Sequence, residues 1–354
     1  MIYNVIRNNH GAGRPERSSM TGQPEHSGDD ALYSPPLTLN PALLSQVAAI
    51  AEVLGRWSAR QDVLPSPLLR RENRIHTIQA SLAIEQNSLS LEQVTALFDG
   101  QRVIGPARDI QEVRNAITAY DAMPSWDPAN PQHLLEAHGL LMAGLIDGPG
   151  CFRRGGVGIY RGDQLVHMAP PAPRVPVLVA DLLAWLAAST WHPLLVSCVA
   201  HYELEFIHPF ADGNGRLGRL WQTLILSSWN PLLAWLPIEE VIRSRQQGYY
   251  ESLGQADQQG DLQPFVAYQL EAIHDALRSE ISSEIGSEIG VKPGAAIDAL
   301  ILRDLAIEPT LSARRLAERQ QLSQRAVEKH LAALQQKGRL IRHGSPRAGY
   351  WQVL

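Results

Sequence analysis

Residues 208–219 read HPFADGNGRLGR, and the rest of the chain is best interpreted outward from them. Pro209 disfavours helical backbone at His208, so a helix that precedes it is expected to end there and present the imidazole at its tip. The Gly-Asn-Gly run at 213–215 frees the backbone where a helix rich in Leu and Trp is expected to begin. The N–H groups and positive dipole end of such a helix form an anion site.

The polar side chains of this stretch suit chemistry on a phosphate ester. Histidine titrates near neutral pH, so His208 is a candidate general base. Arg216 and Arg219 share one helical face, and their guanidinium groups suit phosphate oxygens. Asp212 offers a hard oxygen ligand that would hold Mg²⁺ against a polyphosphate. Together these groups predict phosphate-ester chemistry on a nucleotide.

The stretch matches, residue for residue, the signature of the Fic family, His-Pro-Phe-x-Asp/Glu-Gly-Asn-Gly-Arg-x-x-Arg. Eight fixed residue types at set spacing make a chance match negligible. The resemblance extends over roughly residues 70–275. Besides the signature, it includes EVRNAITAYD at 112–121, the 150–153 stretch, a hairpin near 157–168 and Tyr249-Tyr250. It implies a mainly helical, all-α fold with a small β-hairpin flap.

The resemblance implies transfer of AMP from ATP to a Ser, Thr or Tyr hydroxyl of a target protein, self-modification included. His208 would take the hydroxyl proton, and Asp212 would hold Mg²⁺. The implied ATP-binding residues are Gly213, Asn214, Gly215, Arg216 and Arg219, with Arg219 at the γ-phosphate, Val166 and His167 on the flap near the nucleoside, and Asp257 near the base. Relatives often carry Asn at the last of these positions.

A second pattern precedes the core. SLAIE at 81–85 resembles the inhibitory motif of self-restrained Fic proteins, in the subclass with an N-terminal inhibitory helix. Ser81 and Glu85 share a helical face, and the resemblance implies that Glu85 pairs with Arg219. An arginine neutralised in this way cannot clamp a γ-phosphate. Gln86 stands where relatives usually have Gly or Asn, which would leave the helix more readily.

Apolar periodicity predicts helices through most of the chain. The expected helices are 43–57, 67–86, 90–98, 109–123, 131–145, 175–190, 193–207, 214–229, 239–255 and 262–281. Five segments are expected: a flexible leader at 1–36, a helical region with the inhibitory helix at 37–110, the Fic core at 111–280, a linker at 281–294 and a winged-helix domain at 295–354.

The C-terminal segment differs from the rest in charge. Residues 293–354 carry ten Lys and Arg against five Asp and Glu, a net charge of +5, and the preceding 292 residues carry −10. Helices at 295–307, 312–320 and 323–338, followed by a hairpin, resemble a winged-helix domain. In that arrangement Gln324, Arg325 and Lys329 face a DNA major groove and Arg342 and Arg347 lie on the wing. DNA binding and protein docking both fit this segment.

Composition narrows the remaining classes. The 354 residues, 45% hydrophobic and 19% charged, are typical of a folded chain of two or three domains. Two cysteines exclude a disulfide scaffold and suit a reducing cytoplasm. No signal peptide is apparent, so a cytoplasmic location is expected. The apolar run at 175–200 contains Asp181 and a His-Pro pair, so two helices rather than a membrane span are predicted.

Three alternatives stay open at this stage. His201, Glu205 and His208 share a helical face that is able to hold a transition metal. A DNA-binding regulator whose core senses nucleotide is the rival to an enzyme. Within the enzyme class, Glu85 would also serve a hydrolase that removes AMP, and relatives can transfer other phosphate-containing groups. The resemblance further implies a homodimer.

Overall fold

The computed structural model describes residues 33–59, 66–161, 164–288, 298, 301–302, 304–305, 308–320, 324–344 and 349–353. Most of the predicted leader and residues 289–294 of the predicted linker lie outside this range. The chain divides into two compact units, Met1–Leu277 and Arg278–Leu354, with the boundary inside helix α11.

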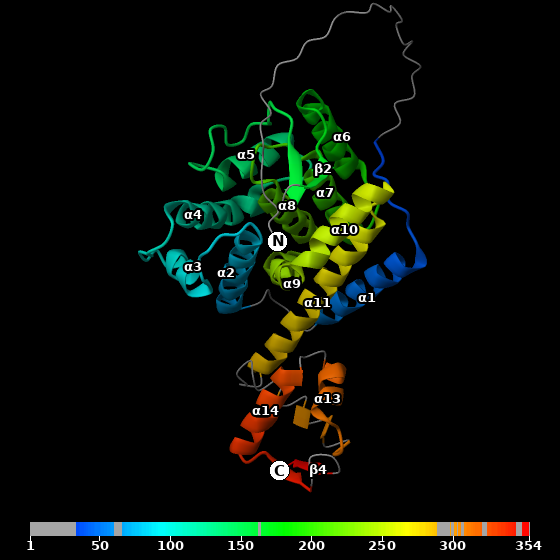
Figure 1. Cartoon of the computed structure of the whole chain (residues 1–354). Coiled ribbons are helices and arrows are strands. Elements are labelled where there is room, and N and C mark those ends of the chain that lie inside the picture. Colours follow the sequence, from blue (N-terminus) through cyan, green and yellow to red (C-terminus); the bar gives the residue numbers. More distant parts are fainter. Residues whose placement is uncertain are drawn as a thin grey trace, which may run out of the picture. The chain divides into compact units, whose positions relative to one another are not determined.

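The first unit is built mainly from helices (Figure 1). They are α1 (Pro41–Ser58), α2 (Pro67–Ile84), α3 (Leu91–Phe98), α4 (Ala107–Ala122), α5 (Pro131–Leu141), α6 (Val175–Ala188), α7 (Pro193–Ile207), α8 (Asn214–Trp229), α9 (Ile238–Ser244), α10 (Gln246–Gln259) and α11 (Gln263–Glu288). Short 3-10 helices lie at Met123–Ser125, Ala172–Arg174 and Pro231–Trp235. The predicted mainly helical fold is confirmed.

Helix starts follow the local sequence closely. The side chains of Asn40, Ser66 and Ser90 accept hydrogen bonds from the first turns of α1, α2 and α3. Ser90 forms a full capping box with Gln93, and Pro occupies an early position in α1 and α2. These caps satisfy amide groups that the helix itself leaves unpaired. The predicted starts therefore lie within two residues of the observed ones for these helices.

Helices α7 and α8 form the centre of the unit and pack side by side (Figure 1). Most residues of both helices are buried. Gly218 of α8 permits a close approach, since a Cβ atom there would lie 2.9 Å from Cδ2 of His201 on α7. The turn between the two helices is therefore held on a rigid, well-packed base.

Three predicted helices differ from the structure. The helix expected at 262–281 continues to Glu288, so residues 281–288 of the predicted linker are helical. The single helix expected at 239–255 is wrong, because α9 and α10 are separated at Arg245. The guanidinium of Arg245 pairs with Glu271 and Asp275 of α11, and its carbonyl accepts from Tyr268. The helix expected at 131–145 ends at Leu141.

The early end of α5 also has a tertiary cause. The amide of Asn115, on α4, donates to the carbonyl oxygens of Leu141 and Ala143 at 3.0 and 2.8 Å. Carbonyl groups that a helix would use are thus satisfied by another element. Gly144 follows with φ 71°, a left-handed conformation that ends the turn.

The predicted hairpin is present. Strands β1 (Gly158–Arg161) and β2 (Gln164–Met168) pair antiparallel, with Ile159 opposite His167 and Arg161 opposite Gln164. The register shifts between Ile159 and Tyr160. The two residues of the turn lie outside the described range.

The apolar run at 175–200 forms α6 and α7, separated at residues 189–192, as expected. Within the described part of the chain, no helix combines the length and apolar character needed to cross a lipid bilayer.

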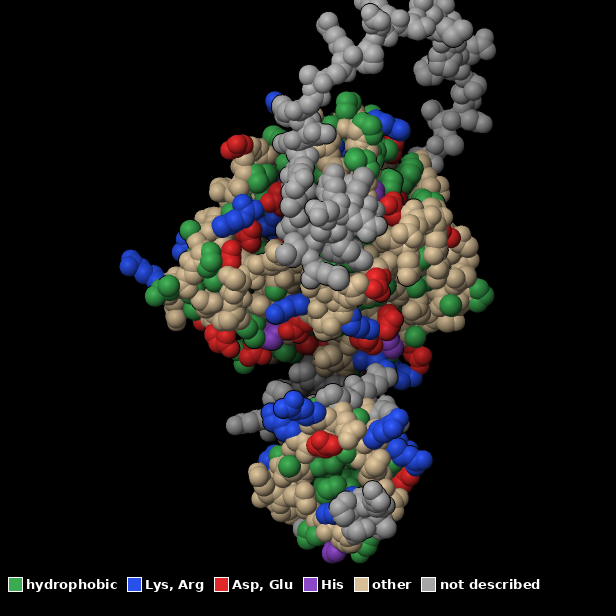
Figure 2. Space-filling view, in the orientation of Figure 1, with side chains coloured by type: hydrophobic (Ala, Val, Ile, Leu, Met, Phe, Trp, Pro, Cys, Tyr) green, Lys and Arg blue, Asp and Glu red, His purple; other side chains and the backbone are tan. Residues whose placement is uncertain are grey.

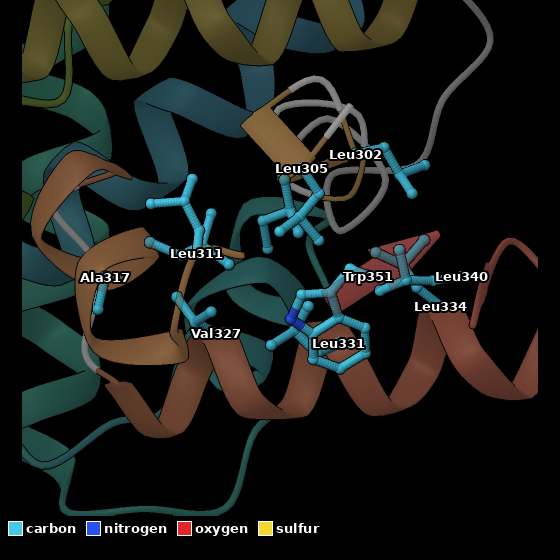
Figure 3. Packing of buried hydrophobic residues seen from close by; sticks show 11 residues of the cluster. Leu302, Leu305, Leu311, Ala317, Val327, Leu331, Leu334, Leu340 and Trp351 are labelled. Atoms are coloured by element: carbon cyan, nitrogen blue, oxygen red, sulfur yellow. The ribbon is translucent and has the colours of Figure 1, made fainter. Parts of the chain in front are cut away.

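The second unit contains α13 (Ala313–Gln320), α14 (Gln324–Gln336), β3 (Leu340–His343) and β4 (Tyr350–Val353). The two strands pair antiparallel, and the amide of Trp351 donates to the carbonyl of Pro309. A separate core gathers between these elements (Figure 3), formed by residues that include Leu305, Leu311, Val327, Leu331, Leu334, Leu340 and Trp351. The Ser312 hydroxyl accepts from the N–H of Arg315 and caps α13. Of the predicted helix at 295–307, only parts are described.

Candidate active site

Residues 208–213 form the turn between α7 and α8, and residues 214–219 form the start of α8, as the sequence predicts. Helix α7 ends at Ile207, and His208 adopts left-handed backbone with φ 48° and ψ 60°. Such a conformation costs an L-residue about 1–2 kcal/mol, so neighbouring contacts must hold it. The side-chain amide of Asn214 does so in part. It accepts from the N–H of Phe210 at 2.9 Å and donates to the Phe210 carbonyl at 3.0 Å.

Arg153, from the loop before the hairpin, holds the same turn from the other side. Its guanidinium donates to the backbone carbonyl oxygens of His208 at 2.7 Å, Gly155 at 2.8 Å and Pro170. Its backbone N–H donates to the carbonyl of Pro209 at 2.9 Å. A buried cation thus orients the backbone on which the candidate base sits.

The His208 imidazole is neutral near pH 7. Burial lowers its pKa to about 4, and electrostatic interactions with His167 and Arg153 act in the same direction. Its Nδ1 lies 3.3 Å from the carbonyl oxygen of Glu205, so Nδ1 carries the proton and donates. The lone pair is then on Nε2, where a general base needs it.

The start of α8 forms a backbone cradle for an anion. Gly213 has φ 86° and caps the helix without a side-chain hydrogen bond. A Cβ atom at this position would lie 2.6 Å from the sulfur of Met142, so glycine is required for space as well as for conformation. The N–H groups that follow are oriented as at other anion-binding helix ends.

A carboxylate from another helix lies in this cradle. Oε1 of Glu85, at the C-terminal end of α2, is in close contact with the site where a Cβ atom on Gly215 would project. The same oxygen accepts from Nη2 of Arg219 at 2.8 Å. Nε and Nη2 of Arg219 also donate to the hydroxyl and carbonyl of Ser81 at 2.9 and 3.0 Å. The pairing of Glu85 with Arg219 that the resemblance implies is therefore present, and Ser81 contacts the same guanidinium.

Arg219 is the best-buried cation of the site, with a side chain only 1% exposed. Burial disfavours its charged form, but the carboxylate of Glu85 contributes most to raising the pKa of Arg219 above its usual value. The guanidinium is charged at any ordinary pH and depends on neighbouring anions for compensation.

Asp212 lies at the other side of the cradle and is bound by two arginines. Its Oδ1 accepts from Arg216 at 3.0 Å and its Oδ2 from Arg108 at 2.9 Å. Glu112 contacts both arginines through Oε1, at 3.0 Å from Nη1 of Arg216 and 3.3 Å from Nε of Arg108. Two carboxylates and two guanidinium groups form one network between α4 and the start of α8.

This network also reaches the segment that follows Glu85. Nδ2 of Asn87 donates to Oε2 of Glu112 at 2.9 Å and to the carbonyl of Asp109 at 3.1 Å. The amide and hydroxyl of Ser88 donate to the Asp109 carboxylate. Gln86, just before, has φ 69°. Gln86 therefore adopts a left-handed conformation as the chain leaves the helix, and the residues that follow it are anchored to α4.

His138 of α5 holds the backbone of the turn between α7 and α8. Its side chain is fully buried and stacks on Phe210 with ring centroids 3.7 Å apart. Nδ1 accepts from the N–H of Gly150 at 2.9 Å, so Nε2 carries the proton and donates to the carbonyl of Asp212 at 2.9 Å. Burial lowers the pKa of His138 to about 4, which keeps this tautomer neutral.

The hairpin is tied to the same region through His167. Its Nε2 lies 3.0 Å from the carbonyl of Phe206 on α7, and its Nδ1 lies 3.2 Å from Oδ2 of Asp257 on α10. His167, predicted near the nucleoside, and Asp257, predicted near the base, thus contact each other. The side chain of Val166 lies outside the described residues.

The donor groups fit a nucleotide phosphate. Arg216 is 5% exposed, and its Nε is buried without a hydrogen bond to any residue that the structure describes. An orphaned guanidinium N–H beside a glycine cradle is suited to a phosphate oxygen. The cradle already holds one carboxylate, which shows that it accommodates negative charge.

The groups also fit Mg²⁺ shared with a nucleotide. The Asp212 carboxylate is 35% exposed and lies beside the cradle. Protein-bound Mg²⁺ commonly uses one or two carboxylates plus substrate phosphates and water. Among the described residues, no cluster of three or more His, Cys, Asp or Glu side chains is arranged to hold a metal. The alternative metal site at His201, Glu205 and His208 is therefore wrong.

Comparison with known proteins agrees with this geometry. The profile of the Fic/DOC family matches residues 128–226. The crystal structure of a Fic family protein from Desulfovibrio desulfuricans G20 is 50% identical, with a TM-score of 0.68, and the match covers 91% of this chain and 98% of that one. The chain belongs to the Fic family.

More distant Fic proteins also match. Protein adenylyltransferase Fic from Culex quinquefasciatus is 29% identical over 283 residues, which is 69% of this chain and 54% of the relative. Protein adenylyltransferase fic-1 from Caenorhabditis elegans is 32% identical over 216 residues, 56% of this chain and 40% of the relative. The chain thus spans about half the length of these curated relatives or less.

Sequence reasoning missed several residues that build the site in this Fic protein. Arg108 and Glu112 lie i, i+4 at the start of α4, a spacing visible in the sequence but without a visible partner. Arg153 belongs to the 150–153 stretch, but nothing in the sequence indicated that its guanidinium holds the turn at His208. His138 gave no signal, because a single histidine in an apolar helix is ordinarily a core residue.

Proposed function

We propose that this protein is a protein adenylyltransferase that moves AMP from ATP to a hydroxyl of a target protein, and that Glu85 restrains it. The printed names of the matching relatives from C. quinquefasciatus and C. elegans support the reaction class. The complete 208–219 signature supports it at the level of residues. The observation that carries the proposal is a neutral His208 beside an anion cradle that begins α8.

His208 acts as the general base. Nε2 accepts the proton of the target hydroxyl as its oxygen attacks the α-phosphorus of ATP, and pyrophosphate leaves. A low pKa makes imidazole a modest base but keeps it fully unprotonated near neutral pH. Arg153 and Asn214 keep the ring in place through the backbone that they hold.

The α8 N-terminus holds the nucleotide. Backbone groups at Gly213, Asn214 and Gly215, together with Arg216, contact the phosphates, and Arg219 meets the γ-phosphate. Asp212 would hold Mg²⁺, whose charge would offset that of the α- and β-phosphates. Positioning and charge neutralisation supply most of the rate in such a site.

Glu85 acts as the restraint because it occupies the guanidinium of Arg219, which the γ-phosphate would bind. Its carboxylate already accepts from Arg219 and lies against Gly215. An ATP molecule that binds with Glu85 in place is denied this arginine, so its phosphates are held away from the reactive pose. Movement of the end of α2 would relieve the restraint.

The hairpin serves as the flap. Its strands would pair with an extended target segment through backbone hydrogen bonds. His167 and Val166 would lie near the nucleoside, and Asp257 near the base. The contact between His167 and Asp257 supports a shared role in closing the flap over the nucleotide.

Transfer of label from α-³²P-ATP in the presence of Mg²⁺ tests this function. Wild type, Glu85→Gly and Glu85→Gly/His208→Ala are compared for self-labelling and for labelling of lysate proteins. Glu72→Gly, an exposed carboxylate on the same helix α2, is the matched control. Strong labelling by Glu85→Gly alone is expected. Parallel reactions with γ-³²P-ATP distinguish nucleotide transfer from phosphate transfer.

Other outcomes favour the alternatives. If no variant labels any protein although each binds ATP, the transferase function is wrong and a nucleotide sensor becomes the better description. If wild type removes AMP from a modified protein and Glu85→Gly does not, Glu85 positions water in a hydrolase. Sedimentation of the purified chain tests the homodimer.

We also propose that the second unit is a winged-helix docking module. Exposed Arg314, Arg315, Arg325 and Lys329 on α13 and α14 support DNA as its partner, and Figure 2 displays Lys and Arg side chains on this surface. Arg342 stacks on Trp351 at 4.6 Å, so it also serves packing. Arg347 lies outside the described residues. Salt-dependent binding of duplex DNA, lost in Arg325→Ala/Lys329→Ala, is expected. Capture of a protein partner without DNA binding favours docking.

A further inference from the structure

Glu205 is a carboxyl group that the proposed reaction does not use, although it lies beside the cradle. It belongs to the last turn of α7, and its side chain is 13% exposed. Its Oε1 lies 3.3 Å from the position of a Cβ atom on Gly215. The carboxylate of Glu85 contacts the same position even more closely. Two ionised carboxylates so close together repel, so one of them is expected to be neutral.

The His201 ring, which faces Glu205, is neutral. Nδ1 of His201 lies 2.7 Å from Oε1 of Gln222 and 3.2 Å from Nε2 of Gln269. A proton on Nδ1 satisfies the shorter of these contacts. His201 is fully buried, and burial lowers its pKa to about 3, so the ring carries only this one proton.

Glu205 itself has few partners. The Tyr249 hydroxyl lies 3.1 Å from Nε2 of His201 and donates to Oε1 of Glu205 at 3.4 Å, a long hydrogen bond. Nε2 of His201 lies 3.9 Å from the same carboxyl oxygen. Among the described residues, no Lys or Arg lies within ion-pair distance of Glu205, whereas Glu85 pairs with Arg219. A buried carboxyl group without a cationic partner favours its neutral form.

Charges of both signs act on Glu205. Burial, followed by the negative charge of Glu85, raises its pKa, whereas the positive charge of Arg219 and the hydrogen bond from Tyr249 lower it. The raising effects are larger, and the pKa of Glu205 lies at about 7. Arg219 forms its hydrogen bonds with Glu85 and Ser81 rather than with Glu205.

We propose that Glu205 is held as a neutral acid at the cradle, and that an anion binds against Gly215 and Arg219 only while Glu205 is protonated. The anion is the Glu85 carboxylate in the restrained protein. It is the terminal phosphate of ATP in the released one, and this second half rests on the proposed function. Glu205 is therefore a positioning residue. Its protonation makes the binding of either anion to Arg219 depend on pH.

Proton uptake on ATP binding tests the nucleotide half. Glu85→Gly/His208→Ala removes the restraint, turnover and the titration of His208, and loss of the Glu85 charge lowers the pKa of Glu205. Titration calorimetry with Mg²⁺-ATP in two buffers of different ionisation enthalpy measures the protons taken up. Adding Glu205→Gln is expected to reduce the uptake by up to about one proton per ATP between about pH 6 and 8. Equal uptake with and without Glu205→Gln overturns the nucleotide half.

The pH dependence of stability tests the neutral acid without nucleotide. A group whose pKa is raised from 4.5 in the unfolded chain to about 7 stabilises the fold below the lower value, and this contribution is lost as pH rises through the higher one. Relative to wild type, Glu205→Gln should gain up to about tenfold per pH unit in its folding equilibrium constant across that interval.

Two further variants separate the titration of Glu205 from other effects on stability. Glu72→Gln, on the exposed face of α2, should differ from wild type by a constant amount at every pH. Glu205→Met provides a second neutral side chain if Glu205→Gln does not fold. A constant difference for both Glu205 variants overturns the proposal. If ATP binds to no variant, the proposed function fails, whereas the stability curves still decide the state of Glu205.

Discussion

Nη2 of Arg219 lies 2.8 Å from Oε1 of Glu85, across 134 residues of sequence. This ion pair joins the end of α2 to the first turns of α8. Ser81 accepts two further hydrogen bonds from the same guanidinium, one through its hydroxyl and one through its carbonyl. Because Arg219 is only 1% exposed, replacement of these partners requires the end of α2 to move.

Ser81→Ala is expected to loosen the restraint in part. It leaves Nε of Arg219 buried without a partner, which costs about 1–3 kcal/mol in folding stability. Self-labelling should rise to a level between those of wild type and Glu85→Gly, and urea unfolding should shift to lower concentration. Ser45→Ala, on the exposed face of α1, is the control and should change neither property. Labelling equal to wild type with reduced stability would assign Ser81 a packing role alone.

Gln86→Gly is expected to stabilise the folded protein. Gln86 has φ 69°, a conformation that costs an L-residue roughly 1 kcal/mol relative to Gly. Urea unfolding should show a gain of about that size. Gln255→Gly, at an exposed position in the interior of α10, is the matched control and should lose about 1 kcal/mol. A loss of similar size in Gln86→Gly would mean that the Gln86 side chain contributes more than its backbone costs.

Arg108→Ala is expected to strengthen metal binding at Asp212. The guanidinium of Arg108 is 53% exposed and pairs with the oxygen of Asp212 that a metal would use. A partly exposed pair of this kind contributes about 0.2–1 kcal/mol, so the Mg²⁺ concentration for half-maximal ATP binding should fall by up to roughly fivefold. A fluorescent ATP analogue and Glu85→Gly/His208→Ala allow this measurement without turnover.

Arg114→Ala, also exposed on α4, serves as the control for Arg108 and should leave the Mg²⁺ dependence unchanged. A higher Mg²⁺ requirement in Arg108→Ala would mean that Arg108 binds the nucleotide rather than competing with the metal.

The pH profile of transfer should reflect the low pKa of His208. Burial and nearby positive charge lower this pKa from 6.5 to about 4. His208 therefore stays unprotonated as pH falls from neutral, and loses its role only when pH approaches the lower value. At saturating ATP, transfer by Glu85→Gly should hold constant down to about pH 5 and fall below it. Half-maximal transfer near the ordinary histidine pKa would contradict the role of burial, provided that tryptophan fluorescence shows a folded protein.

Local sequence was enough to predict most helices of the first unit. The capping box at Ser90 and the caps at Asn40 and Ser66 mark helix starts with groups that lie within three residues of each other. Helix ends were less predictable. Those at Leu141 and Arg245 depend on Asn115, Glu271 and Asp275, which belong to other helices.

The sequence by itself determined the residues of the 208–219 loop and the i, i+4 spacing of Ser81 and Glu85, because helix periodicity and backbone freedom are local properties. Only the tertiary structure decided which groups these residues meet. Arg108 and Glu112 reach Asp212 and Arg216, and Glu205 meets Glu85 at Gly215, because packing of α2, α4, α7 and α8 brings them together. Their charges and proton states depend on burial and on partners far away in the chain, so no local pattern encodes them.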